Sequence, residues 1–451
     1  MGEIIMPARK GRATNSGRIT VGLDAVRAGI KLAQNHALRV LKPAQRDLQY
    51  GLELHREIAV VDSFGFAPFC AVDPGVLDRA VGEGASAAER SELWNEMRVT
   101  RCVYDKNERE EFQFVWRAAG ITALFQNAGG CGLPETFAHY CLVIDRMPDF
   151  FVRATTPDEV LAAKKAGKHA MLFSSNIVPL AGDGSSIPGE LRLLRAFFSA
   201  GFRQAHLTYN RANQLADGCA ESRNGGLTDL GRAAVAAMND AGIMVDVAHT
   251  GWRSSYEAAK ASRLPIIASH TACCGVFEHC RGKPDEAIKA IAAGGGIIGV
   301  VWLPAFLGKH ADMNTMLDHV DYLAKLVGTD HIAMGTDAIY RTCRCEAESR
   351  KAPVNPVPKS RPALETFWPA GMATNAPEWD MARADSLAWV NRPYATVGLK
   401  QRGYSDDDIA RITGGNHLRV LQANLDGRKI PGFPGPASKN PAGSAARNGK
   451  K

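Results

Sequence analysis

The run Ile243-Met-Val-Asp-Val-Ala-His249 is followed by a second, Pro265-Ile-Ile-Ala-Ser-His270, whose last histidine comes 21 residues after that of the first. Both runs are almost continuously apolar rather than alternating, which is typical of parallel strands covered on both faces. The segment between them has room for one crossover helix. The two runs therefore predict neighbouring parallel strands that each carry an imidazole at the carboxyl end.

Six more runs of similar character bring the predicted strands to eight. They lie at Ile58–Phe64, Ile121–Gln126, Ala170–Ser174, Ala205–Tyr209, Gly296–Trp302 and Ile332–Asp337. Helical patterns alternate with the later runs, and two of them are clear: one has an apolar stripe from Leu230 to Ala241 with Thr228 as N-cap, and the other extends from Leu317 to Val327. Eight strands alternating with helices predict an α/β fold, the (β/α)8 TIM barrel, with residues 65–120 as an insertion.

The two ends of the 451-residue chain differ from its middle. Residues 1–18 and 428–451 are basic and lack apolar periodicity, so we expect both to be disordered tails. Residues 19–56 carry apolar side chains at helical spacing and predict a helical extension. This extension has two possible partners, a neighbouring copy of the chain or the base of its own barrel. The barrel domain is expected over residues 57–427.

Charge and composition argue against several classes of function. The 54 basic and 47 acidic residues give a net charge of +7, but the tails hold more than this excess, so residues 19–427 are slightly negative. A folded domain that binds nucleic acid is expected to carry positive charge itself. No apolar run is long enough to span a bilayer, and we expect no signal peptide. With ten cysteines expected as reduced thiols, we predict a cytoplasmic protein.

Candidate catalytic residues follow from the barrel, because active sites of this fold lie at the carboxyl ends of the strands. His249 and His270 end adjacent predicted strands, and Asp337 ends the last one. Two imidazoles at one mouth can bind a divalent metal, and a nearby carboxylate can take a proton from a metal-bound water. A single buried histidine is more often a hydrogen-bonded core residue, but three such residues at strand ends together favour a site.

These residues belong to a set of motifs that closely resembles the renal-type membrane dipeptidase family of the amidohydrolase superfamily. The resemblance covers about residues 50–425 and is strongest from 200 to 340. The motifs are His206-Leu-Thr-Tyr-Asn-Arg-Ala-Asn-Gln-Leu-Ala-Asp217, Gly226-Leu-Thr-Asp-Leu-Gly231, Val245-Asp-Val-Ala-His249, Ser269-His270, Arg281, Gly335-Thr-Asp337 and Arg402-Gly-Tyr-Ser-Asp-Asp-Asp-Ile409. The resemblance implies a TIM barrel of the metal-dependent hydrolase type, whose two-zinc centre hydrolyses dipeptides.

The resemblance also implies roles for individual residues. His249 and His270 match the two histidines of the family's second metal site, and Asp337 matches the carboxylate that handles protons. Arg281 matches the arginine that binds the carboxylate of the substrate, a role that suits its planar, bidentate guanidinium. Tyr209 stands where the family has a substrate-binding histidine, and it can still donate a hydrogen bond to an oxyanion.

The sequence departs from the family at the other three expected zinc ligands. The first strand of the family supplies a His and an Asp, but the matching positions here are Phe64 and Phe66. The bridging Glu of the third strand is replaced by Ser174 or Ser175, depending on the alignment. Neither a phenyl ring nor a neutral serine hydroxyl replaces such a ligand, so we expect at most one zinc per chain, and none as a further possibility.

Several functions remain open from the sequence. The first is a dipeptidase-like hydrolase that cleaves a dipeptide or an N-acyl amino acid with at most a mononuclear zinc site. The alternatives are a catalytically inactive scaffold or binding protein and a single-metal deacylase or lactonase. A thiolate from one of two cysteine pairs could complete a mononuclear site, although ordinary core or loop thiols are the more common case: Cys273, Cys274, Cys343 and Cys345. Because members of the family are commonly dimers, we expect a homodimer.

Overall fold

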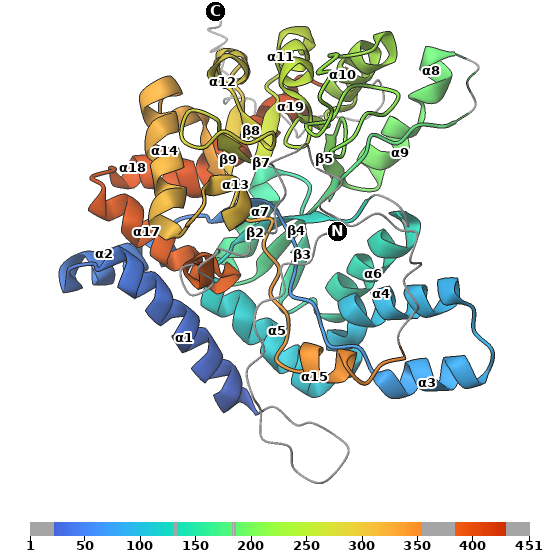
Figure 1. The fold of residues 1–451 in the computed structure, drawn as a ribbon, viewed down its shortest axis with the longest axis vertical. Coiled ribbons are helices and arrows are strands. Elements are labelled where there is room, and N and C mark those ends of the chain that lie inside the picture. The colour runs from blue at the N-terminus through green and yellow to red at the C-terminus, as the bar shows by residue number, and fades with distance from the viewer. Residues whose placement is uncertain (1–21, 130–132, 183, 185, 354–383, 430–451) are drawn as a thin grey trace, which may run out of the picture.

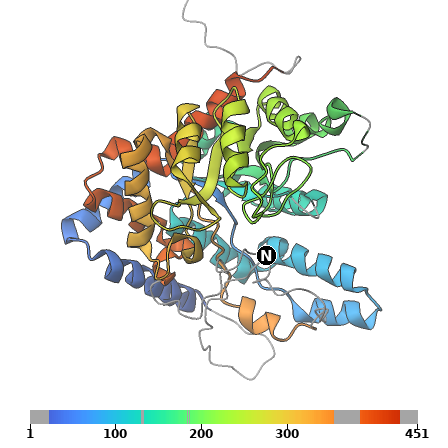
Figure 2. The same cartoon turned by 45° about the horizontal axis from the view of Figure 1, so that its top comes forward.

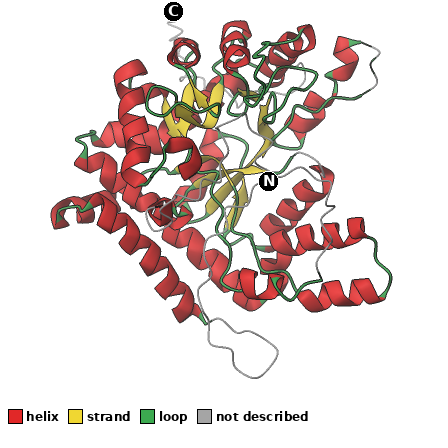
Figure 3. Cartoon of the chain, in the orientation of Figure 1, coloured by secondary structure: helices red, strands yellow, loops and turns green. Residues whose placement is uncertain are grey.

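In the computed structural model, which describes residues 22–129, 133–182, 184, 186–353 and 384–429, eight parallel strands form a nearly closed barrel surrounded by helices (Figures 1 and 3). The predicted TIM barrel is therefore confirmed, and every barrel strand overlaps a predicted one. In barrel order, the strands are β1 (Val61–Gly65), β2 (Ala123–Asn127), β4 (His169–Ser175), β5 (Phe202–His206), β6 (Met244–Asp246), β7 (Ile267–Cys273), β9 (Ile297–Val300) and β10 (Ile332–Met334). Nearly all their residues are buried, which explains why the runs are continuously apolar.

The last strand returns to the first. The backbone N–H of Asp337 donates to the carbonyl of Phe64 at 3.0 Å, and that of Thr336 donates to the Asp62 carboxylate at 2.8 Å. Two very short strands lie outside the predicted set: β3 (Phe151–Arg153) pairs with β4, and β8 (Gly282–Lys283) pairs with β7.

The helices that follow the strands cover the outside of the barrel (Figure 1). Thr228 accepts a hydrogen bond from Gly231 N and thus caps α10, as its position in the sequence predicts. The longer helices of this layer are α6 (Leu133–Arg146), α7 (Pro157–Lys165), α9 (Leu193–Ser199), α10 (Asp229–Ala241), α11 (Trp252–Ala261), α12 (Asp285–Ala293), α14 (Met313–Val327), α17 (Arg392–Gln401) and α19 (Asn416–Asp426). Within the described residues, every helix is too short or too polar to span a bilayer.

The N-terminal extension consists of α1 (Leu23–Leu41) and α2 (Gln45–Glu57), and it packs on its own chain (Figure 1). The buried face of α1 contacts α5, α14 and α17, and α2 lies against α17. Two hydrogen bonds tie the extension to the C-terminal part of the chain: Asn391 Nδ2 donates to Ala33 O at 2.9 Å, and Gln401 Nε2 donates to Leu41 O at 3.2 Å. The apolar face of the extension is therefore occupied by its own barrel.

Residues 65–120 form the expected insertion, a group of three helices beside the barrel (Figure 2). The helices are α3 (Pro74–Gly82), α4 (Ala87–Tyr104) and α5 (Lys106–Ala119). Asp73 caps α3 by accepting from Gly75 N, and Cys70 is buried in the main hydrophobic core. Glu83 lies exposed at the end of α3. These three residues lie in or next to the insertion helices, away from the carboxyl ends of β6, β7 and β10.

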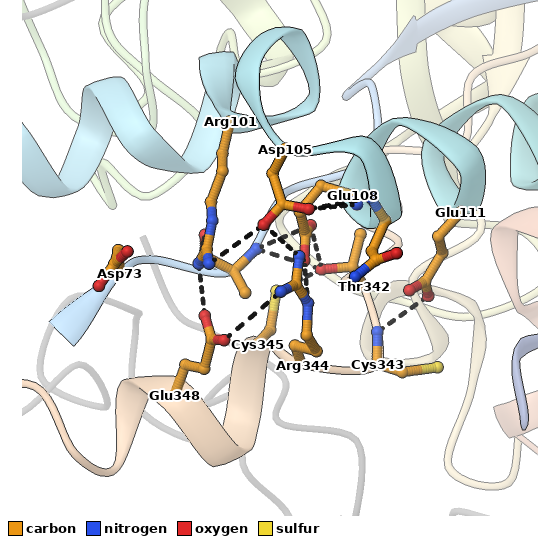
Figure 4. A network of polar contacts seen from close by, with 12 residues as sticks. Asp73, Arg101, Asp105, Glu108, Glu111, Thr342, Cys343, Arg344, Cys345 and Glu348 are labelled. Atoms are coloured by element: carbon orange, nitrogen blue, oxygen red, sulfur yellow. Dashed lines mark hydrogen bonds and ion pairs between the residues drawn. The ribbon is translucent and has the colours of Figure 1, made fainter. Parts of the chain in front are cut away.

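A buried polar network joins the insertion to the loop that follows β10 (Figure 4). Glu108 of α5 is fully buried and accepts hydrogen bonds from Ala71 N, Thr342 Oγ1 and Arg344 Nε. Glu111, one turn later, accepts from the backbone N–H of Cys343 at 2.9 Å. The insertion therefore fixes the segment that leaves the barrel just after Asp337.

The predicted limits of the tails, the extension and the barrel domain remain predictions. The two tails, 1–18 and 428–451, lie outside the described residues except for Arg428 and Lys429. The division of the remainder into an extension at 19–56 and a barrel at 57–427 stays a prediction.

Candidate functional site

The structure brings His249 and His270 together at the carboxyl ends of the strands. His249 follows β6, His270 lies in β7, and their Nε2 atoms are 2.8 Å apart. Gly335, at the end of β10, makes this packing possible, because a Cβ there would lie 2.1 Å from the carbonyl of Ser269 and 3.1 Å from the Cβ of His270. Both rings are almost fully buried.

One chain of hydrogen bonds accounts for every nitrogen of these two rings. His249 Nδ1 lies 2.7 Å from Asn210 Oδ1, and His270 Nδ1 lies 2.8 Å from Ser269 Oγ. If Ser269 donates to His270, then His270 Nε2–H donates to His249 Nε2 and His249 Nδ1–H donates to Asn210, with both rings neutral. Burial lowers the pKa of both histidines well below the usual value, and the positive charge of Arg281 lowers it further. The pair is thus a neutral, oriented unit.

Phe64, at one of the positions where the resemblance implies a zinc ligand, covers one side of this pair. Its ring is buried and stacks on His270 at a centroid distance of 4.1 Å. Phe66, the other such position, contacts Phe64 edge-on at 5.8 Å. At the end of β4, Ser174 and Ser175 are buried as well, and the Ser175 hydroxyl donates to Ile177 O. Aromatic rings therefore occupy the space beside His270.

Asp337 follows β10 with a positive φ of 50°, an uncommon conformation for a residue other than glycine. Its Oδ2 lies 3.9 Å from His270 Nε2, and its side chain is 16% exposed. Burial raises the pKa of this carboxyl group to about 7, against an opposing effect of the Arg281 charge. Asp337 is thus placed to exchange a proton near neutral pH.

Two buried cations, Arg281 and Lys283, lie near the histidines. Arg281 donates to the carbonyls of Ala248 and His270, and its Nη2 lies 3.5 Å from His249 Nε2. Among the described residues, no acidic side chain forms an ion pair with Arg281, and its Nε has no hydrogen-bond partner. Lys283 donates to Thr250 O at 2.6 Å, and burial lowers its pKa to about 8. These two buried cations give the site a positive electrostatic potential.

Tyr209 lies at the outer side of the site. Its ring stacks on His249 at 4.4 Å and is 39% exposed. Burial of the phenol raises its pKa to about 12, so the hydroxyl stays protonated and can donate a hydrogen bond at neutral pH.

Sequence reasoning missed a third histidine. His206 ends β5, and its Nε2 lies 2.8 Å from Asp246 Oδ2 in a fully buried pair. Burial alone would raise the pKa of Asp246, but the charge of His206 and hydrogen bonds lower it overall. The predicted strand ran to Tyr209, three residues beyond the observed end, and so concealed His206 inside a strand. An earlier strand end would have placed it beside the other two histidines, 5.1 Å from His249 between ring centroids.

The residues present do not fit a zinc centre of the family type. Catalytic zinc takes three protein ligands, and among the described residues no group of three His, Cys, Asp or Glu side chains is arranged to hold a metal. The hypothesised thiolates point elsewhere: Cys273 Sγ towards His319 O, Cys274 Sγ towards His279 O and Cys345 Sγ towards Phe69 O. Cys343 is exposed on the loop held by the insertion. His249 and His270 instead hydrogen-bond to each other, beside a guanidinium.

Comparison with known proteins supports the resemblance found in the sequence. Residues 136–343 match the model of the membrane dipeptidase family, peptidase family M19. The chain is 27% identical to Dipeptidase aclJ of Aspergillus oryzae over 64% of this chain and 60% of that protein. It is 33% identical to an uncharacterized dipeptidase of Schizosaccharomyces pombe over 53% of this chain and 51% of that protein. The chain thus spans about half to three fifths of these curated relatives.

A solved structure shows the same fold over more of the chain. The probable dipeptidase PvdM of Pseudomonas aeruginosa superposes with a TM-score of 0.61 at 19% identity, covering 85% of this chain and all of that one. The fold is therefore shared well beyond the segment that the family model matches.

Proposed function

We propose, from the premise that the chain is a relative of the membrane dipeptidases, that its barrel mouth hydrolyses a small amide with a free carboxylate, a dipeptide or an N-acyl amino acid. The observation that carries this proposal is the buried guanidinium of Arg281, which has no acidic partner among the described residues and lies beside Asp337 and Tyr209. An unpaired buried cation is costly, and a substrate carboxylate would compensate it.

The proposed reaction uses the residues around the Arg281 guanidinium. With the carboxylate of the substrate on Arg281, Asp337 takes a proton from water as the water attacks the amide carbon. Tyr209 donates a hydrogen bond to the oxyanion, and Asp337 then passes the proton to the leaving amine. A carboxyl group with a pKa of about 7 suits both halves of this exchange near neutral pH. No step is assigned to zinc, because the described residues supply too few ligands.

The test is hydrolysis of a panel of dipeptides and N-acyl amino acids, measured with a chelator and with added zinc. We expect cleavage that needs the free carboxylate, persists with the chelator, and falls at least about 100-fold in kcat for Asp337→Asn. The exposed Asp407 provides a matched control, and Asp407→Asn should leave the rate unchanged. Absence of hydrolysis under both conditions would overturn the proposal. Cleavage that requires zinc would instead favour the mononuclear dipeptidase, deacylase or lactonase.

A second candidate function is a catalytically inactive binding protein, and the stacking of Phe64 on His270 favours it. This packing fills the position of a lost ligand with apolar bulk. Calorimetry would distinguish the two candidates: binding of a dipeptide without turnover, lost on removal of its carboxylate, supports the second.

We further propose that the protein works as a homodimer in the cytoplasm, from its resemblance to the family and from the absence of disulfide bonds among the described residues. Light scattering on the purified chain tests the first part, and a monomer at micromolar concentration would contradict it.

A further inference from the structure

The carboxyl groups of the barrel strands are already engaged inside the protein. Asp62 in β1 accepts hydrogen bonds from Thr336 N at 2.8 Å and from Thr336 Oγ1 at 2.7 Å. Asp246 in β6 accepts from Ala248 N at 3.0 Å, and its second oxygen lies 2.8 Å from His206 Nε2. Both acidic residues are fully buried. Neither carboxyl group is therefore available to a substrate.

Asp337 is the third carboxyl group beside the histidine pair, and its side chain is 16% exposed. The proposed hydrolysis uses it to take a proton from water, a role that it cannot fill while it is paired with an ammonium group. On the neighbouring loops, Asp217 is paired with Arg223, and Glu278 is exposed to water. These acidic residues leave an ammonium group next to the reacting bond without a counter-ion.

The buried cations of the site exceed the charge that one substrate carboxylate can offset. Arg281 and Lys283 are both buried, and Arg281 Nη2 lies 3.5 Å from His249 Nε2. The two α-carbons of a dipeptide are about 3.8 Å apart, so its N-terminal ammonium group would lie close to the cations that bind its carboxylate. Their repulsion disfavours a zwitterionic dipeptide and leaves a neutral acyl group unaffected.

Apolar rings extend from the histidine pair on its other side. Phe64 stacks on His270, and Phe66, which follows the carboxyl end of β1, contacts Phe64 and Phe69 at centroid distances of 5.8 and 5.9 Å. Phe64 and Phe69 are buried, whereas Phe66 is partly exposed. An acyl chain that covers the exposed part of Phe66 would remove apolar surface from water on both partners.

Three apolar side chains are exposed on loops that follow barrel strands. They are Ile177 after β4, Tyr209 after β5 and Val276 after β7, each between 37 and 39% exposed. The carboxyl ends of the strands in this fold open on one face, so all three lie on the face that carries the site. Together with the row of phenyl rings, they favour a ligand that is apolar at the end away from Arg281.

We propose that the preferred substrate is an N-acyl amino acid with an apolar, uncharged acyl group, rather than a dipeptide with a free ammonium group. This inference rests on the proposed hydrolysis and narrows it to one substrate class. The oxygen of water forms a bond to the amide carbon, and the C–N bond breaks. One proton of the water passes through Asp337 to the leaving nitrogen. The products are an apolar carboxylic acid and a free amino acid.

The test compares three compounds that differ in one substituent of the acyl α-carbon. N-propionyl-alanine, N-lactoyl-alanine and alanyl-alanine carry a hydrogen, a hydroxyl and an ammonium group at this position. With the wild-type protein, we expect kcat/KM for alanyl-alanine to be at least about tenfold below that for each neutral compound. Lengthening the acyl group from propionyl to hexanoyl should raise kcat/KM at least about fivefold.

The outcomes separate the substrate class from the reaction. Cleavage of alanyl-alanine as fast as N-propionyl-alanine would overturn the class and leave the hydrolysis intact. An equally slow reaction of N-lactoyl-alanine would overturn it as well, because size rather than charge would then decide. If no compound is cleaved, the hydrolysis fails, and calorimetry tests the class by itself. Tighter binding of N-propionyl-alanine than of alanyl-alanine supports the class, and equal or weaker binding overturns it.

A pair of variants tests the surface that receives the acyl group. Phe66→Ala should reduce the gain from propionyl to hexanoyl to less than about twofold, because it removes the partly exposed ring. Leu161 on α7 is 49% exposed on the outside of the barrel, and Leu161→Ala should leave the gain unchanged. An unchanged gain in Phe66→Ala would overturn the contact with this ring. The wild-type comparison decides the substrate class without any variant.

Discussion

Phe64 shows how one side chain sets the surroundings of a histidine pair. The resemblance implies a zinc-binding histidine at this position, but the phenyl ring that stands there stacks on His270. The consequence extends to His249, whose Nε2 meets the neighbouring imidazole directly. The two histidines are thus joined by a direct hydrogen bond.

The pKa of Asp337 predicts a specific dependence of stability on pH. A folded-state pKa of about 7, above the value of about 3.9 for an unfolded Asp, means that the folded protein binds more protons between these values. The contribution of Asp337 to stability is therefore fully present below pH 4 and is lost as the pH rises towards 7. Relative to Asp337→Asn, we expect the wild type to lose on the order of 2 kcal/mol in unfolding free energy between pH 5 and pH 7.

Urea denaturation of both proteins across this pH range measures the effect. Asp407→Asn, at an exposed carboxylate, should give a profile parallel to that of the wild type. Parallel profiles for the wild type and Asp337→Asn would show that the carboxyl group titrates normally.

The sequence indicates some site residues and conceals others for physical reasons. His249 and His270 end long apolar runs, so the pattern that predicts the strands also predicts their position. His206 follows the polar pair Arg203 and Gln204, which interrupts the apolar pattern and shifts the predicted strand three residues late. Lys283 belongs to a strand of two residues, which is too short to produce any periodicity.

At the scale of elements, α5 holds the loop after Asp337 through two buried carboxylates, those of Glu108 and Glu111. Glu108 pairs with Arg344, from a segment 236 residues away, and accepts from a backbone N–H as well. We expect Glu108→Gln to destabilise the protein by about 2 kcal/mol, because it removes the fully buried carboxylate of the three that surround the Arg344 guanidinium and leaves only Asp105 and Glu348. Chemical denaturation followed by circular dichroism measures this loss.

Glu110, two residues away on the same helix, is the matched control. Its carboxylate pairs with Lys106 at the surface, so Glu110→Gln should change stability by less than about 0.5 kcal/mol. Equal losses for the two variants would mean that the network of Figure 4 contributes no more than an exposed ion pair.

The sequence predicts an insertion at residues 65–120, where the three helices lie, but it does not predict that these helices hold the loop after β10. Helical periodicity depends on residues a few positions apart, whereas the contacts of α5 with residues 342–344 depend on chain segments that only the closed barrel brings together. The extension is a similar case: its amphipathic pattern fits a neighbour or its own barrel equally well, and only the folded chain distinguishes them.

For the whole molecule, the ligand geometry predicts that folding is not linked to zinc. Metal that binds the native state stabilises it by mass action, so a resident ion would raise the unfolding temperature. We expect protein purified without added metal to contain less than one zinc per chain, and its Tm to be unaffected by a chelator. About one zinc per chain that is lost in His249→Ala would contradict this expectation.

The arrangement of α1 and α2 bears on the order in which the protein can fold. These are the first helices of the described chain, yet their partners Asn391 and Gln401 are synthesised more than 300 residues later. The helix α1 can meet α5 soon after both are made, but the contacts of α1 and α2 with α17 form only when almost the whole barrel has been made. Contacts of such long range slow folding and leave partly made chains prone to aggregation. The helices α1 and α2 are thus among the last described parts of the chain to complete their native contacts, because α17, which covers them, is made late.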